Sequence, residues 1–582
     1  MEFVFSNKSF IGAQHITPHL YAIGPFSPKN GVLNYLKGFV FDDDYTEKDL
    51  LAIDLRQCTP KGGYVFVKYD IQKEILILKT DKRAFINCYI FQHQGKIGIS
   101  DNPWLLAKIF KEDISIDLDS LYAQMLYTTD IHPHRTLLTH ISRIGANTTL
   151  IWNIKEGKLE QESNYSFNYH PSNSLSLSDF IDRADEGFTK YFNYIKQSNP
   201  NQTAGFGCSG GLDSRLIAYY TQKVGLPVTS FVVARQKPHR LMLSTTALTS
   251  KLVAERYNIS RRFIEYDEDW LEQSMILDIR NHPFFFSQAF LNPIKELPPM
   301  DYMLAGDPGG YAYMADAVLS NSYERLKGHA SFYLGMKKDS ILGICDIIRK
   351  AAHHLHLPVD LSSEHGLMGL GTSTLNRVVP ASIQEKVRNE LFAIIDELPG
   401  DNNIEKWISI HDNMTTKYMA SSAYDSMNAT KRFYPLYYPF FSELIQELPG
   451  ELFQNKKFLK ALLEYVNSDF LKIPDQNLNR INGYESVYKR TWNRFELAIR
   501  GRGLDFLSYL RKTTYKSLVK RCMQKDNPIF NRVVNKQQLL GSGIFFTYAG
   551  VQYLKLKMIC DIVYYQDFDI LFSDNDYSMA SW

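Results

Sequence analysis

Hydrophobic and polar residues alternate with a period of two over much of the first 165 or so residues. This alternation predicts β-strands, because successive side chains of a strand point to opposite faces. Turn residues such as Gly62-Gly63 and Gln94-Gly95 separate the runs. The elements expected here are strands at Tyr64–Asp70, Ile75–Leu78 and Asn87–Phe91, a short helix at Pro103–Phe110, and a closing hairpin of Thr148–Trp152 with Lys158–Gln161.

The pattern changes after residues 168–178, a polar stretch with Pro and Ser that indicates a linker between domains. From Phe180 onward, stretches with helical periodicity alternate with short apolar strands, and from about Ser340 helices dominate. Alternating strands and helices predict a parallel sheet covered on both faces. We therefore expect an α/β chain with one domain at residues 1–167 and a second at residues 179–582, whose C-terminal part is helical.

Composition narrows the classes of protein. A chain of 582 residues is too long for one ordinary domain, and 45% hydrophobic residues can form sizeable cores. The net charge of +2 predicts no nucleic-acid partner and no anionic membrane surface. No apolar run approaches the roughly 20 residues of a membrane span. The six cysteines are scattered without a CxxC pair, so we expect a protein of the reducing cytoplasm.

The motif with the most chemical content is a predicted strand that runs into a glycine turn, which in turn opens a helix. Cys208 is followed by the SGGLDS sequence of Ser209–Ser214 and then by an amphipathic stretch. Glycines let the backbone approach an anion closely, and the first N–H groups of a helix are unpaired. Asp213 alone would repel a phosphate, so it indicates a Mg²⁺ ion between the carboxylate and a pyrophosphate. The alternative is an ordinary Gly-Ser turn that caps a helix.

SGGxDS resembles the pyrophosphatase loop of ATP-dependent, AMP-forming ligases. Further segments resemble the asparagine synthase superfamily, which also contains β-lactam synthetase and lasso-peptide macrolactam synthetases. These segments are distributed along the chain from residue 64 to residue 449: Tyr64–Phe91, Asp101–Leu150, Ala247–Ile259 and Tyr434–Pro449. The resemblance implies an N-terminal Ntn-hydrolase-like αββα domain, a degenerate glutaminase, followed by an adenine-nucleotide α-hydrolase-like ligase domain with a parallel sheet.

The same resemblance implies the binding residues. ATP is expected at Cys208, Ser209, Gly210, Gly211, Leu212, Asp213, Ser214, Val233, Ala305 and Gly306, and Mg²⁺ at Asp213 and Asp307. Backbone groups where the strands end would contact the adenine edge, and Val233 would supply an apolar wall. The alternative for Val233 is that it belongs to the sheet core, because buried strands are rich in valine.

The sequence departs from the family pattern in two places. Family glutaminase domains carry an N-terminal cysteine nucleophile, whereas position two here is Glu2, so glutamine hydrolysis is expected to be lost. The second family loop, SGxGxDE, corresponds to Leu304–Tyr311, where Gly310 replaces the usual second metal-binding aspartate. Asp307 then has either a catalytic and metal-binding role or a place in a simple Asp-Pro-Gly turn. For the lysine that the family uses late in the reaction, the candidates are Lys472, Arg480 and Lys489.

The resemblance implies an ATP-dependent amide ligase that activates a carboxylate as an acyl-adenylate for attack by ammonia or a substrate amine. Lasso-peptide macrolactam formation is one form of this reaction. Two alternatives stay open: an asparagine synthetase, and a non-catalytic relative that binds nucleotide or peptide within a biosynthetic complex. The expected partners are a small-molecule or peptide carboxylate and a leader-peptide or peptidase protein.

Overall fold

The computed structural model describes residues 3–127, 132–264, 300–306, 429–473, 513–534 and 548–572, together with positions 276, 279–280, 382, 386, 389–390 and 393. Within these ranges it leaves out 12, 25–26, 30, 43, 47–48, 50–58, 133, 164–168, 173, 234–240, 437–439 and 454–456.

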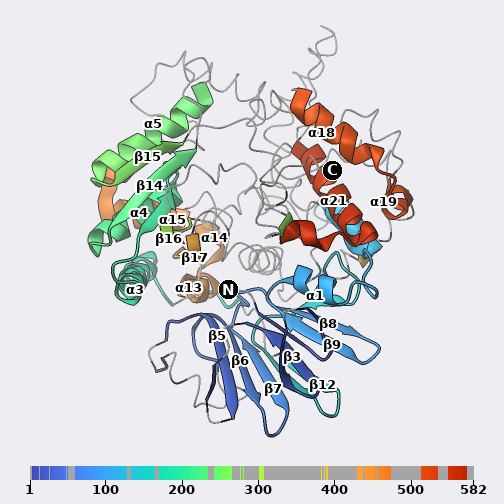
Figure 1. Cartoon of the computed structure of the whole chain (residues 1–582). Helices are drawn as coiled ribbons and strands as arrows, with labels where there is room; N and C mark the ends of the chain where they lie inside the picture. The colour runs from blue at the N-terminus through green and yellow to red at the C-terminus, as the bar shows by residue number, and fades with distance from the viewer. Residues whose placement is uncertain are drawn as a thin grey trace.

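The N-terminal part forms two antiparallel sheets, each with six strands among the described residues (Figure 1). The first sheet has the order β10 (Ile141–Arg143), β8 (Tyr89–His93), β9 (Lys96–Ser100), β1 (Val4–Ser6), β3 (Leu20–Ile23), β2 (Gln14–Thr17). The second has the order β12 (Lys158–Ser163), β11 (Thr148–Asn153), β7 (Ile75–Thr80), β6 (Gly62–Asp70), β5 (Val32–Val40), β4 (Ser27–Lys29). The hairpin predicted near residues 148–161 is β11 and β12.

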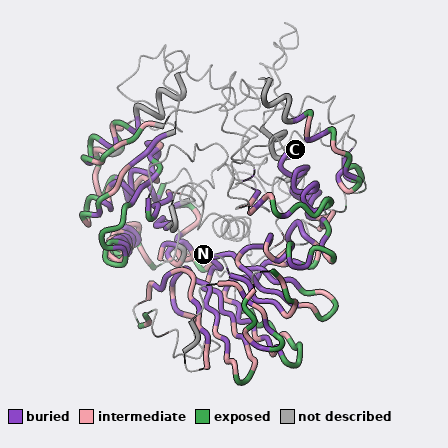
Figure 2. Tube along the Cα trace, viewed as in Figure 1, coloured by how far each residue is buried: buried purple, intermediate pink, exposed green. Residues whose placement is uncertain are grey.

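The central strand β6 shows how the sheets are layered. Val65 and Val67 lie in the main core, which also contains residues of the first sheet. Tyr64 and Phe66 alternate with them and form a separate buried cluster with Val40. Because neighbouring residues of a strand face opposite ways, β6 is buried on both faces. Figure 2 shows the resulting continuous purple stretches in this part of the chain.

One helical layer of the expected αββα arrangement is visible. Helix α1 (Pro103–Ile109) packs on β8, β9 and β10 of the first sheet. It begins after Asn102, whose side chain accepts a hydrogen bond from the Trp104 N–H, and a proline at the first helical position suits this start. Helix α2 (Leu118–Tyr127) follows.

After residue 200, the described part of the chain contains a sheet of five parallel strands. Its order is β15 (Ser260–Ile264), β14 (Val228–Val233), β13 (Ala204–Gly207), β16 (Met300–Leu304), β17 (Ala429–Phe433). From β13 the chain moves outward through β14 to β15 and then returns to place β16 on the other side of β13. The strand order therefore reverses between β13 and β16, which makes this the topological switch point.

Four helices form one layer beside this sheet. Helix α4 (Leu212–Lys223) connects β13 to β14, and α5 (Leu241–Arg256) connects β14 to β15. Successive right-handed crossovers in one direction put their helices on the same face. Accordingly α4 contacts α5, and it also contacts α3 (Leu177–Ser198) and α15 (Lys457–Asn467). The other short elements of this part of the chain are α13 (Phe441–Glu447), α14 (Gly450–Phe453) and the 3₁₀ helix η8 (Ser468–Lys472).

The stretch expected to be a linker is more ordered than its composition indicates. Helix α3 begins at Leu177, inside the predicted linker, because Ser176 and Asp179 form a reciprocal capping box. Further upstream, the backbone N–H of His170 donates to the Gln446 carbonyl at 2.9 Å and that of Ser172 to the Glu447 carbonyl at 2.8 Å. These bonds fix the connection against α13.

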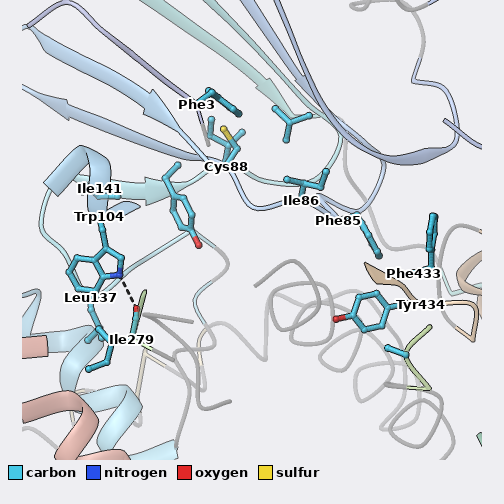
Figure 3. Packing of buried hydrophobic residues seen from close by; sticks show 14 of the residues in the cluster. Phe3, Phe85, Ile86, Cys88, Trp104, Leu137, Ile141, Ile279, Phe433 and Tyr434 are labelled. Carbon is cyan, nitrogen blue, oxygen red and sulfur yellow. Dashed lines mark hydrogen bonds between the residues drawn. The ribbon is translucent and has the colours of Figure 1, made fainter. Parts of the chain in front are cut away.

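Aromatic contacts join the N-terminal sheets to the parallel sheet. The ring of Phe39 in β5 lies 5.2 Å from that of Phe433, the last residue of β17, and the ring of Phe85 lies 5.6 Å from that of Tyr434. Figure 3 shows Phe85 directed toward Phe433 and Tyr434. The Phe433 carbonyl accepts a hydrogen bond from the Ala305 N–H at 2.8 Å. The N-terminal sheets therefore support the end of the parallel sheet at which Ala305 lies.

The C-terminal helices pack against the N-terminal domain. They are α18 (Thr513–Gln524), α19 (Pro528–Val533), α21 (Tyr548–Tyr565) and η10 (Phe568–Leu571). Helix α21 contacts α2, and η10 contacts α1. On the same side, the Trp104 indole N–H donates to the Ile279 carbonyl at 2.9 Å (Figure 3). No helix among the described residues has both the length and the hydrophobicity to cross a bilayer.

Candidate nucleotide-binding site

Two loops meet at the switch point of the parallel sheet. Cys208–Gly211 connect β13 to α4, and Ala305 and Gly306 follow β16. A Cβ atom added to Gly306 would lie 3.4 Å from the Asp213 Cβ, so the end of β16 packs directly against the first turn of α4. In open α/β sheets, ligands bind in the crevice beyond the carboxyl ends of the strands at such a point.

Gly210 can only be glycine. Its φ is +77°, a backbone conformation that costs an L-residue about 1–2 kcal/mol. A Cβ atom there would lie 2.4 Å from the Thr249 Oγ1 and 2.5 Å from the Thr249 Cβ, well inside van der Waals contact. The same Thr249 hydroxyl donates to the Ser209 carbonyl at 3.2 Å. The glycine therefore lets the loop lie against α5.

The beginning of α4 has the geometry of an anion site. Its N-cap is Gly211, with φ −69° and ψ 169° and no capping side chain. Gly207, the last residue of β13, is exposed, while Ser209 and Asp213 are half-buried. The backbone N–H groups of an uncapped first turn carry partial positive charge. Here they lie at the carboxyl end of β13, close to the exposed Gly207, and such a helix start favours a phosphate.

The two serines and the cysteine of the motif differ in the hydrogen bonds that they form and in their access to an anion. The Ser214 hydroxyl donates to the Gly211 carbonyl at 2.9 Å and is buried, so it braces the helix start. The Ser209 Oγ accepts from the Gly211 N–H at 3.2 Å, and its own proton can be donated to an anion. Cys208 is buried and its N–H donates to the Phe231 carbonyl at 2.8 Å. Burial raises the pKa of the Cys208 thiol, which keeps it neutral.

Arg215 is a site residue to which the sequence interpretation assigned no role. Its side chain is buried, the Nε donates to the Gly210 carbonyl and the Nη1 to the Ile473 carbonyl, both at 2.9 Å. The signal that could have found it is a charge within the apolar stretch that opens α4, since a buried guanidinium requires hydrogen-bond acceptors. The arginine therefore joins the glycine turn to the segment after η8.

The remaining predicted residues have different outcomes. Leu212 is buried in the first turn of α4. Val233 ends β14 opposite Ile264, and its side chain is outside the described part. Lys472 closes η8 with its side chain 77% exposed and its Nζ 2.7 Å from the Asp469 carboxylate, so this structure does not direct it into the loop. Asp307, Arg480 and Lys489 lie outside the described residues.

The donor set at the loop fits a magnesium ion that is shared with phosphates. Among the described residues, no group of three or more His, Cys, Asp or Glu side chains could hold a metal by itself. Asp213 provides one half-buried carboxylate in the first turn of α4. Mg²⁺ in nucleotide enzymes is commonly held by one or two carboxylates and completed by phosphate oxygens and water. A single carboxylate beside a phosphate site matches that pattern.

Comparisons with known proteins return no family model and no curated protein that matches this chain. Among solved structures, NMN synthetase from Francisella tularensis is 16% identical, with a TM-score of 0.16, and the match covers 24% of this chain and 59% of that chain. An NH3-dependent NAD synthetase from Campylobacter jejuni is 11% identical, with a TM-score of 0.17, over 39% of this chain and 99% of that chain. Glutamine phosphoribosylpyrophosphate amidotransferase from B. subtilis is 10% identical, with a TM-score of 0.19, and the match covers 54% of this chain and 71% of that chain. Likenesses at this level say nothing about the activity of this chain, whose chemistry must be inferred from its own loop and sheet.

Proposed function

We propose that this chain is an ATP-dependent amide ligase of the asparagine synthase type. It activates a substrate carboxylate as an acyl-adenylate, releases pyrophosphate, and transfers the acyl group to an amine with release of AMP. The observation that carries this proposal is the loop Ser209–Asp213, in which Gly210 is held at positive φ between a parallel strand and the uncapped first turn of α4. This loop lies at the switch point, beside Gly306.

In the first step, a carboxylate oxygen attacks the α-phosphorus of ATP, and the bond to the pyrophosphate oxygen breaks. The loop N–H groups and the Ser209 hydroxyl bind the leaving pyrophosphate as preorganised donors. Asp213 would hold Mg²⁺, which would offset the negative charge of the phosphates. In the second step, the amine nitrogen attacks the acyl carbon and loses a proton, and AMP leaves with the bonding electrons. Asp307, Lys472 and Arg480 remain our candidates for proton transfer and charge stabilisation.

The adenosine part of ATP is assigned to the carboxyl ends of three strands. Cys208 follows β13, Val233 ends β14, and Ala305 follows β16. Backbone groups at these ends can bond to the adenine edge, and an apolar residue at the end of β14 can cover its face. We place the nucleotide there because a phosphate on the Ser209 loop leaves these neighbouring strand ends for the base.

The experiment that tests the function is carboxylate-dependent exchange of labelled pyrophosphate into ATP, with calorimetric titration of Mg–ATP alongside. Candidate carboxylates include aspartate, β-amino acids and peptides with an acidic side chain or a free C-terminus. Exchange with any of them supports the ligase, and aspartate with ammonia as the best pair would identify an asparagine synthetase. If neither ATP nor pyrophosphate binds, the proposal is wrong.

A second candidate is a relative that binds nucleotide without turning it over, as part of a biosynthetic complex. The observation that favours it is Lys472, whose ammonium pairs with Asp469 at the surface rather than facing the loop. This candidate predicts tight ATP binding with no exchange for any carboxylate. Adding a leader-peptide or peptidase partner would then leave exchange absent, whereas a ligase that needs its partner would gain it.

We expect free ammonia or a substrate amine, and not glutamine, to supply the nitrogen. The four described cysteines, Cys88, Cys208, Cys522 and Cys560, are all buried. Burial raises the pKa of each thiol, whereas a nucleophilic cysteine needs a lowered pKa and access. Incubation with labelled glutamine should therefore give no glutamate above a no-enzyme background. Glutamate formation at a rate near that of AMP release would contradict this expectation.

A further inference from the structure

We propose that Arg215 is a positioning residue that orients the peptide between Gly210 and Gly211, so that its N–H, and not its carbonyl oxygen, faces the pyrophosphate. Thr249 fixes the preceding peptide by binding the Ser209 carbonyl, so that the whole loop keeps one conformation. The inference rests on the proposed function, because it names the residues that prepare the loop for its anion.

The Arg215 guanidinium holds the carbonyl end of this peptide in the interior. Its Nε donates to the Gly210 carbonyl at 2.9 Å, and the arginine side chain is only 1% exposed. In a trans peptide the carbonyl oxygen and the following N–H point in opposite directions. The N–H of this peptide belongs to Gly211 and donates to the half-buried Ser209 hydroxyl at 3.2 Å. The carbonyl therefore points toward the buried guanidinium, and the N–H points the opposite way, toward the half-buried Ser209 side chain.

The preceding peptide is held in the same way. The Thr249 side chain is buried in α5, and its hydroxyl donates to the Ser209 carbonyl at 3.2 Å. That peptide carries the Gly210 N–H, which must point away from Thr249 for the same reason. Two successive carbonyl oxygens are thus bound by buried donors, which fixes both peptides. The Gly210 N–H faces the buried Cys208 thiol, whereas the Gly211 N–H donates to the Ser209 hydroxyl and would exchange that partner for the anion.

The loop needs these donors because its own residues resist rotation weakly. Gly210 and Gly211 flank the peptide, and glycine adopts positive and negative φ about equally readily. A reversed peptide would turn the Gly210 carbonyl oxygen toward the negatively charged pyrophosphate. Without the guanidinium, the peptide would populate both orientations, and only one of them binds the anion. The apparent affinity for pyrophosphate would then fall in proportion to the fraction of molecules in the binding orientation.

A second bond fixes the guanidinium itself. The Nη1 of Arg215 donates to the Ile473 carbonyl at 2.9 Å, just after η8. Asp469 of η8 forms an ion pair with Arg256 at the end of α5. The planar fork of arginine can serve two carbonyls at once, which a lysine ammonium on a flexible stem does less rigidly. The loop conformation is therefore tied to the C-terminal segment as well as to α5.

The test compares Arg215→Gln and Arg215→Lys with the wild type by calorimetric titration of Mg–pyrophosphate and of adenosine, which has no phosphate. We expect Arg215→Gln to weaken pyrophosphate binding by at least about tenfold, the loss typical of a hydrogen bond to a charged group. Arg215→Lys should recover part of that affinity, because one N–H can still reach a carbonyl. Adenosine affinity should change less than about twofold in both, since its contacts lie at the strand ends.

Arg143→Gln is the matched control for stability. Arg143 is also a buried arginine, and its Nη2 donates to the Ala84 carbonyl at 3.2 Å in the N-terminal domain. This variant should lose thermal stability but keep the wild-type affinity for pyrophosphate. Equal losses of pyrophosphate and adenosine affinity in Arg215→Gln, or no loss of either, would overturn the proposal.

If Arg215→Gln does not fold, Thr249→Val tests whether the buried donors orient the loop. Valine has nearly the shape of threonine and removes only the donor to the Ser209 carbonyl. Weaker pyrophosphate binding supports the orienting role of the buried donors, and unchanged binding overturns it. A wild-type chain that binds no pyrophosphate would instead refute the proposed function itself, so the two failures are distinguishable.

Discussion

Replacing Asp213 with asparagine should lower ATP–pyrophosphate exchange by at least about a hundredfold, the usual loss when an electrostatic group that acts in the transition state is removed. Asp213 lies in the first turn of α4, against Gly306 and beside the phosphate loop, where a carboxylate is useful chiefly as a metal ligand. The change keeps the shape of the side chain and removes its charge. The measurement is the exchange rate at matched Mg²⁺ with the best carboxylate.

The matched control is Asp179→Asn. Asp179 also lies in the first turn of its helix, α3, where it takes part in the capping box. Both variants lose a favourable interaction between a carboxylate and a helix N-terminus, worth about 0.3–1 kcal/mol. We expect similar small decreases in the thermal unfolding midpoint, with normal exchange only in Asp179→Asn. Exchange near the wild-type rate in Asp213→Asn would remove this carboxylate from the mechanism.

Gly210→Ala should weaken Mg–ATP binding by at least about tenfold, because the three nearest neighbours of the new methyl group, all atoms of Thr249, would lie 2.4–2.8 Å away. The backbone conformation at φ +77° costs about 1–2 kcal/mol, and the new Cβ would lie 2.4 Å from the Thr249 Oγ1. The loop must then move off α5, which displaces the N–H groups that bind the phosphate. Calorimetric titration of ATP and thermal unfolding without ligand are the two measurements.

Gly225→Ala separates the backbone strain from the clash. Gly225 follows α4 with φ +64°, but a Cβ there would meet only the Lys196 Nζ, at 3.5 Å. This variant should lose about 1 kcal/mol of stability from the positive φ alone and bind ATP normally. Suppose instead that Gly210→Ala is as stable as Gly225→Ala and binds ATP with the same affinity. The close packing of the loop on Thr249 would then have no effect on ATP binding.

The parts of the fold that could be predicted are those specified by neighbouring residues. The hairpin of β11 and β12, helix α1 and the succession β13–loop–α4 follow from hydrophobic periodicity, turn glycines and capping residues, which act over a few positions. The interpretation of residues 168–178 as a linker missed the start of α3, although Ser176 and Asp179 carry the sequence signature of a capping box. The polar composition of this stretch was given more weight than its capping-box signature, which was present in the sequence.

The sequence did not fix the positions of single polar side chains. Lys472 was one of three basic candidates, and the structure shows its side chain exposed and paired with Asp469, three residues earlier. Arg215 was visible as part of the motif, but its two acceptors are carbonyls of Gly210 and Ile473, and the second is far away in the chain. A buried charge reveals its role only when its acceptors are known.

The chemistry of the loop was encoded locally: a strand, a glycine turn and a helix start suffice to predict an anion site, because the glycine conformation and the unpaired N–H groups belong to adjacent residues. Which other loop lies opposite that site was not encoded locally. Gly306 reaches Asp213 only because the chain returns to place β16 beside β13, and this depends on the packing of the whole sheet. The orientation of the loop peptides was likewise decided by Arg215 and Thr249 from two different helices, since peptides flanked by glycine have no strong preference of their own.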